Sequence, residues 1–95
     1  MVTAATETCA VCASPATITD WRPLEDWLSV EGCPCNGFFI RKWLWAGELR
    51  RMLRPDRAAL SARIRAQRAN GGEAWVSTED GKDGRIVISG QRRKL

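Results

Sequence analysis

The pattern of apolar and polar positions predicts strands in the N-terminal part of the chain. Residues 16–21 (ATITDW) and 26–31 (DWLSVE) alternate or nearly alternate apolar and polar side chains, as half-buried strands do. Residues 38–45 (FFIRKWLW) are rich in aromatic and β-branched side chains and predict a third strand. Residues 1–8 carry no comparable pattern, and we expect them to form a flexible leader.

The pattern changes to a helical one in the middle of the chain. Residues 48–53 are expected to form one or two helical turns. Residues 55–70 are rich in alanine and arginine, with a proline at the first position and a glycine pair after the last, and predict a longer helix. Leu60 and Ile64 lie four residues apart, so they share one helix face and are expected to pack on the strands.

The C-terminal part returns to strand-forming residues. Residues 73–78 and 85–89 flank a turn segment rich in Gly and Asp, which predicts a β-hairpin. The fold class is therefore predicted as α+β: a three-stranded β module, a basic helix and a C-terminal β-hairpin. The expected organisation is a flexible leader (1–8), one domain (9–90, with a β module at 9–45, a helical part at 46–72 and a hairpin at 73–90) and a basic tail (91–95).

The four cysteines form two close pairs, Cys9-Ala-Val-Cys12 and Cys33-Pro-Cys35, with 20 residues between the pairs. Two turns that each present two sulfurs are typical of a four-thiolate tetrahedral metal site, and zinc is the expected ion. The chain has no histidine, so mixed Cys/His sites are excluded. Four protein ligands leave no open position for water, which predicts one structural zinc ion and not a catalytic one.

This cysteine pattern resembles a zinc ribbon, in which two cysteine knuckles at the ends of hairpins clamp one zinc ion. The resemblance covers residues 9–45 and implies that Cys9, Cys12, Cys33 and Cys35 are the ligands. The second pair departs from the ribbon pattern, because a single residue, Pro34, separates its cysteines where two are usual. The resemblance therefore implies a ribbon with nonstandard geometry at the second knuckle.

Two other uses of the cysteines remain open. Iron also accepts four thiolates, although the spacing of the second pair is not typical of a rubredoxin-like site. A thiol redox function would require a helix that starts at Cys12, and Ser14-Pro15 argues against that helix.

The basic residues are concentrated in one part of the chain. The formal net charge is +4, and residues 41–68 carry nine basic residues against Glu48 and Asp56. This segment could bind nucleic-acid phosphates or an acidic protein partner, or it could be an ordinary solvated surface. The candidate residues for nucleic-acid or partner binding are Arg41, Lys42, Arg50, Arg51, Arg54, Arg57 and Arg68, and Arg65 would add to the same charge.

The five tryptophans allow two interpretations. Trp43, Trp45 and their neighbours could stack on single-stranded bases. Tryptophans in a small domain more often supply the bulk of the core, and we expect core packing here. The five are Trp21, Trp27, Trp43, Trp45 and Trp75.

The remaining sequence features indicate a binding protein. The acidic residues Asp20, Glu25, Asp26 and Glu31 lie near no histidine or phosphate-binding loop, so we do not expect an enzyme. No apolar run is long enough for a membrane span, and no signal peptide is indicated, so we expect a cytoplasmic protein. The expected function is a small intracellular zinc-binding protein that acts as a protein-interaction or regulatory module. A nucleic-acid-binding zinc-ribbon protein is the alternative, and a thiol redox protein is a minor one.

Overall fold

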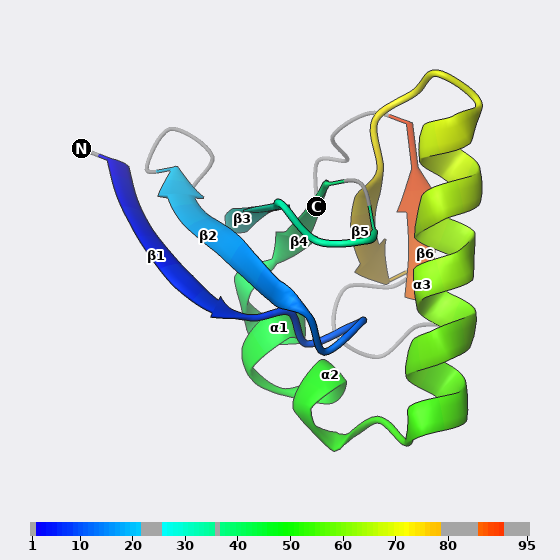
Figure 1. Ribbon diagram of the computed structural model, residues 1–95, viewed down its shortest axis with the longest axis horizontal. Helices are drawn as coiled ribbons and strands as arrows, with labels where there is room; N and C mark the ends of the chain where they lie inside the picture. The colour runs from blue at the N-terminus through cyan, green and yellow to red at the C-terminus, as the bar shows by residue number, and fades with distance from the viewer. Residues whose placement is uncertain (1, 22–25, 36, 79–85, 91–95) are drawn as a thin grey trace.

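A computed structural model describes residues 2–21, 26–35, 37–78 and 86–90 of the chain (Figure 1). The expected turn at 79–84 and the expected basic tail at 91–95 lie outside these residues. The described elements, in chain order, are the strands and helices β1 (Val2–Thr8), β2 (Pro15–Trp21), β3 (Trp27–Glu31), β4 (Phe38–Arg41), α1 (Lys42–Ala46), α2 (Glu48–Arg51), α3 (Arg54–Ala69), β5 (Trp75–Thr78) and β6 (Ile86–Ser89).

The described strands form one mixed sheet whose spatial order equals the chain order. Neighbouring strands are antiparallel, except that β5 runs parallel to β4. A parallel pair needs a long crossover connection, and the helices α1, α2 and α3 supply it. The α+β class is confirmed. The division into a three-stranded module and a separate hairpin is corrected, because β5 pairs with β6 on one side and with β4 on the other.

Residues 2–8 are not a loose leader. Val2–Thr8 forms β1 and pairs with all seven residues of β2, from Val2 opposite Trp21 to Thr8 opposite Pro15. Residues 4–8 are exposed, because β1 lies at the edge of the sheet. An edge strand with exposed side chains needs no alternation of apolar residues, so the hydrophobic pattern did not reveal it.

The third predicted strand is shorter than expected. β4 ends at Arg41, which pairs with Trp27, the first residue of β3. One more backbone hydrogen bond follows this pair, from the Lys42 amide to the Asp26 carbonyl at 2.7 Å, and the chain then turns into α1. The helix buries Leu44 and Trp45, which a strand would have placed on opposite faces.

Helix α3 confirms the predicted central helix and its apolar face. It covers one face of the sheet, and Leu60 and Ile64 are buried there. The core on this face joins residues of both helices and strands. Its members include Ile18, Val30, Ile40, Leu44, Leu49 and Val76, together with Cys9, Cys33 and Cys35.

Aromatic side chains occupy the opposite face of the sheet. Phe39 stacks on Trp75 with ring centroids 3.9 Å apart, and Trp75 meets Trp27 edge-on at 5.0 Å. The Arg41 guanidinium lies 4.2 Å from the centroid of the Trp27 ring. Trp27 and Trp75 are therefore packing residues and do not form an exposed stacking platform.

The tryptophans of the helical region are not an exposed platform either. Trp45 is buried in the core, and Trp43 is partly buried against it. The Arg50 guanidinium lies over the Trp45 ring at 5.3 Å. The side chain of Trp21 lies outside the described part of the chain. Core packing is thus confirmed for Trp27, Trp45 and Trp75.

Candidate metal centre

The first cysteine pair lies in the turn that joins β1 to β2. The Cys9 amide donates to the Ser14 carbonyl at 2.8 Å, and the Ala13 amide donates to the Cys9 carbonyl at 2.9 Å. Ala13 has a φ of +62°, a left-handed conformation that closes the turn. These constraints fold the turn tightly, so Cys9 and Cys12 project to the same side.

The second pair lies in the turn that joins β3 to β4. Gly32 and Gly37 flank this turn with φ values of +81° and +88°, conformations that glycine adopts without a steric penalty. The left-handed glycines let the chain reverse although only Pro34 separates Cys33 from Cys35.

The pairing of β2 with β3 brings the two turns together. Thr17, near the start of β2, lies opposite Glu31, the last residue of β3. The turn before β2 and the turn after β3 therefore emerge at the same end of the sheet. This register explains how cysteines 20 residues apart in the sequence become neighbours.

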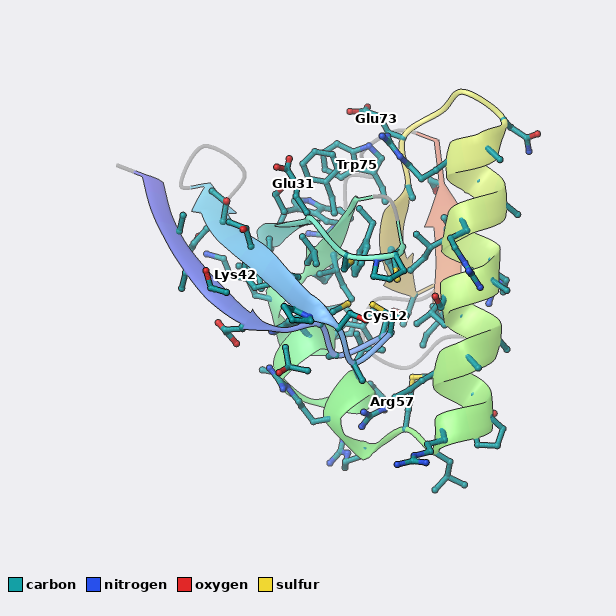
Figure 2. All side chains as sticks on the ribbon, in the orientation of Figure 1. Cys12, Glu31, Lys42, Arg57, Glu73 and Trp75 are labelled. Carbon is teal, nitrogen blue, oxygen red and sulfur yellow. The ribbon has the colours of Figure 1, made fainter. Side chains whose placement is uncertain are left out.

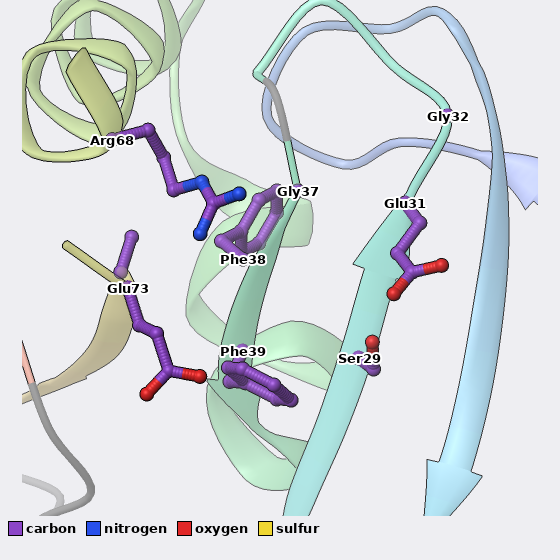
Figure 3. Close-up of a pocket in the computed structure, with 9 residues that line it drawn as sticks. Ser29, Glu31, Gly32, Gly37, Phe38, Phe39, Arg68 and Glu73 are labelled. Atoms are coloured by element: carbon purple, nitrogen blue, oxygen red, sulfur yellow. The ribbon is translucent and has the colours of Figure 1, made fainter. Parts of the chain in front are cut away.

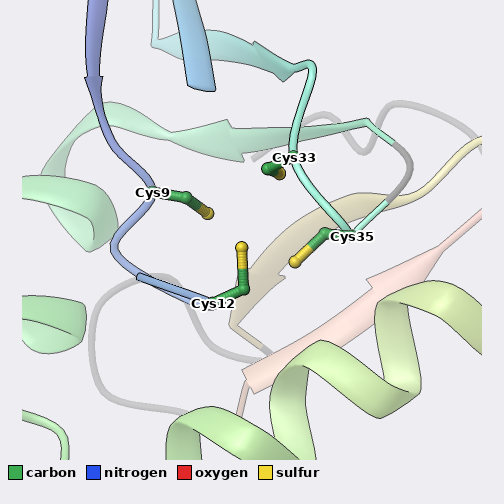
Figure 4. A group of neighbouring side chains, drawn as sticks. All are labelled: Cys9, Cys12, Cys33 and Cys35. Atoms are coloured by element: carbon green, nitrogen blue, oxygen red, sulfur yellow. The ribbon is translucent and has the colours of Figure 1, made fainter. Parts of the chain in front are cut away.

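The four sulfur atoms converge on one point between the turns (Figure 4). All four lie within 4.8 Å of one another. A tetrahedral zinc ion with Zn–S bonds of about 2.3 Å places its sulfurs about 3.8 Å apart, so the cluster is close to the required size. Cys9, Cys33 and Cys35 are buried, and Cys12 is partly exposed. The cluster could hold one metal ion with four sulfur ligands.

A fifth side chain, Ser61 of α3, belongs to this centre. Its Oγ lies 3.3 Å from the Cys35 Sγ, and both residues are buried. A serine hydroxyl can donate to a metal-bound thiolate and so orient it. The sequence reasoning missed Ser61, although one signal was present: it is a polar residue next to Leu60 on the buried face of a predicted helix.

The sulfurs influence one another electrostatically when no ion is bound. A hydrogen bond from the Cys35 thiol lowers the pKa of the Cys9 thiol to about 5, against the opposing effect of burial. Donating that bond raises the pKa of Cys35, and burial adds to the effect. Burial also raises the pKa of Cys33 to about 11. Without an ion, Cys9 thus favours the thiolate while Cys33 and Cys35 favour the protonated form, and four thiolates at this distance require a cation.

Each of the four basic candidates from residues 41–51 forms an ion pair with a carboxylate. Arg41 is also buried, so it is not available to a phosphate. The ion pairs are Arg41–Asp26 (3.8 Å), Lys42–Asp20 (2.7 Å), Arg50–Glu7 (3.7 Å) and Arg51–Glu48 (3.9 Å).

The basic candidates on α3 are divided between two places. Arg54, Arg57 and Arg65 line a groove of about 600 Å³ between the helix and the two cysteine turns. We call this the arginine groove; Val11, Ala13 and Pro34 line it from the side of the turns, with Cys12 at its edge. Arg57 reaches α2, where its NH2 group donates to the Arg50 carbonyl at 3.2 Å (Figure 2). Arg68 lies elsewhere and donates to the Gly72 carbonyl.

A second hollow, of about 370 Å³, lies at the end of the sheet where β3 ends and β4 and β5 begin (Figure 3). Its lining includes Arg68, the carboxylates of Glu31 and Glu73, and the Phe39 ring. The Glu73 carboxylate accepts a hydrogen bond from the Trp75 indole at 3.3 Å. The hollow mixes both signs of charge and contains no cluster of metal-ligating side chains among the described residues.

No protein-family model, curated protein or solved structure matches this chain. The resemblance to a zinc ribbon therefore rests on the cysteine pattern, and the continuous mixed sheet differs from the three-stranded module that the resemblance implied. In the part of the chain that the structure describes, no helix combines the length and apolar character of a membrane span.

Proposed function

We propose that this protein is a small zinc-binding protein in which one zinc ion, held by Cys9, Cys12, Cys33 and Cys35, has a structural role. The observation that carries the proposal is the convergence of all four sulfurs within 4.8 Å, with three of the four cysteines buried. Soft thiolates select zinc or iron over harder ions. Four protein ligands leave the ion no position for a substrate or a reactive water.

The ion would join the two cysteine turns directly to each other. The cysteine turns lie at one end of the sheet, and Ser61 links them to α3. A domain of 95 residues has a small core, and metal binding adds folding free energy directly. Because Cys9, Cys33 and Cys35 are also part of the apolar core, the metal would stabilise the packing of α3 on the strands.

With a metal that performs no chemistry, the function would reside on the surface that the metal organises. We propose that the protein is a protein-interaction or regulatory binding module. Its location in the cytoplasm and its lack of enzymatic activity stay predictions. Nucleic-acid binding through residues 41–68 has less support, because Arg41, Lys42, Arg50 and Arg51 are paired with carboxylates. A thiol redox function is the third possibility, and metal analysis separates it from the proposal.

Metal analysis of protein purified under reducing conditions tests the proposal. We expect one zinc ion per chain, and replacement by cobalt should produce the absorption bands of a tetrahedral tetrathiolate. The thiols should resist alkylation until the metal is chelated or the protein is unfolded. Iron in place of zinc would correct the ion. Protein that contains neither metal and whose thiols react freely would overturn the site.

A further inference from the structure

The ion pairs of the structure separate the arginines into two groups. Those of residues 41–51 are held by carboxylates, as described above. The arginine groove is lined by Arg54, Arg57 and Arg65. None of these three forms an ion pair within the described residues. The Nε of Arg57 is buried and has no hydrogen-bond partner in the described structure. Donors of this kind are costly to bury unless a ligand satisfies them.

The groove combines this charge with an apolar surface. Val11, Ala13 and Pro34 form its floor on the side of the cysteine turns, and none of the described residues that line it carries a carboxylate. A zinc ion with four thiolates would carry a formal charge of −2, which three guanidinium groups more than offset. The groove therefore stays attractive to anions when the metal is bound, and its volume of about 600 Å³ leaves room for several side chains.

We propose that the arginine groove binds an acidic segment of a protein partner. Carboxylates of the segment would pair with Arg54, Arg57 and Arg65, because guanidinium groups bind carboxylates through paired hydrogen bonds. Aliphatic side chains between the carboxylates would pack on Val11 and Pro34. This inference rests on the binding-module function proposed above, and it names the surface and the chemistry of the partner.

The lining favours a peptide over a nucleic acid. Single-stranded nucleic acids bind to grooves whose aromatic side chains stack on the bases. In the part of the chain that the structure describes, no aromatic residue lines the arginine groove. Trp27 and Trp75 lie on the other face of the sheet, and Trp45 is buried. An apolar floor between guanidinium groups matches a segment in which acidic and aliphatic residues alternate.

Fluorescence anisotropy with a labelled peptide in which glutamate alternates with leucine tests the proposal on the metal-loaded protein. We expect saturable binding that weakens as salt is added, and no binding of the same peptide with glutamine in place of glutamate. Arg57→Gln and Arg65→Gln should each weaken binding by about threefold to tenfold. Arg65 makes no hydrogen bond that the fold needs among the described residues, so its variant tests the groove even if Arg57→Gln is unstable.

The control variant is Arg51→Gln, which removes the same charge from an exposed ion pair outside the groove. It should change the affinity by less than about twofold. Equal weakening by Arg51→Gln and Arg65→Gln would reduce the effect to net charge and overturn the proposal. The proposal is also overturned if single-stranded or duplex DNA binds more tightly than the glutamate peptide and this binding depends on Arg65. It is overturned as well if the protein forms a dimer that dissociates on Arg65→Gln.

Metal content, measured on every variant, keeps the two proposals apart. Protein that holds its zinc but does not bind the glutamate peptide overturns the groove and leaves the structural metal in place. Protein that contains no metal overturns the proposed function before the groove is tested.

Discussion

The Cys35 Sγ and the Ser61 Oγ lie 3.3 Å apart, although the two residues are 26 positions apart in the chain. One belongs to the turn between β3 and β4, and the other to the buried face of α3. When the thiolate binds a metal, the serine hydroxyl becomes its hydrogen-bond donor. The contact therefore couples the metal centre to the helix that covers the sheet.

Replacing Ser61 by alanine should weaken metal binding without abolishing it. The thiolate of Cys35 loses a donor, and hydrogen bonds around metal ligands typically change affinity by about tenfold or more. The affinity is measured by competition with a chromophoric zinc chelator. Circular dichroism of the loaded variant should match that of the original protein, because the substitution is small.

Ser77 provides a matched control for this substitution. It is also a fully buried serine, but its Oγ has no hydrogen-bond partner within the described residues. Along β5 it points to the face opposite to that of its neighbour Val76, which belongs to the same core cluster as Cys9, Cys33 and Cys35. Ser77→Ala should leave zinc affinity unchanged and leave the free energy of unfolding equal or higher by up to about 1 kcal/mol. If both variants lose affinity equally, the role of Ser61 at the metal is wrong.

Removing the metal should loosen the whole domain. Chelation under reducing conditions leaves four clustered thiols in the core, so α3 and the strands lose a shared anchor. We expect a lower melting temperature and weaker near-ultraviolet circular dichroism from Trp45 and Trp75. Added zinc should restore both signals and added magnesium should not, since thiolates bind soft ions. An unchanged melting curve after complete chelation would contradict a structural role.

The packing of α3 on the sheet predicts a large difference between two leucines. Leu60 is 2% exposed and Leu53, just before the helix, is 71% exposed. Leu60→Ala should lower the free energy of unfolding by about 2–5 kcal/mol, because it leaves a cavity in the core. Leu53→Ala should change it by less than about 0.5 kcal/mol. Denaturant titration of the metal-loaded variants measures both, and similar costs would show that α3 does not dock as described.

The left-handed residue in the first cysteine turn predicts a stabilising substitution. Ala13 has a φ of +62°, which costs an L-residue about 1 kcal/mol and costs glycine nothing. Ala13→Gly should therefore raise the free energy of unfolding by about 0.5–1 kcal/mol. The control is Ala62→Gly on the exposed face of α3, which should lower it by about as much, since glycine weakens helices. Thermal unfolding at saturating zinc compares the two, and a loss of stability for Ala13→Gly would refute the turn geometry.

Local features of the chain were predictable because their causes are local. The spacing of the cysteines indicated two turns with converging sulfurs, and Pro55 and the glycine pair after Asn70 marked a helix that α3 matches to within one residue at each end. The helical spacing of Leu60 and Ile64 predicted its buried face. The strands β2 and β3 were also predictable. Apolar and polar residues nearly alternate along them, because one face of each strand packs on the core.

Pairing between distant segments decided the rest. β1 became a strand because β2 offered it a partner, and β4 ends at Arg41, opposite Trp27, the first residue of β3. The packing of α3 beside the cysteine turns places Ser61 next to Cys35. The same packing places Arg57 and Arg65 in the lining of the arginine groove. Residue types and spacing specify turns, helix ends and metal-binding chemistry, since these depend on neighbours along the chain. Strand register, ion pairing and helix placement depend on neighbours in space, so they became visible only in the folded protein.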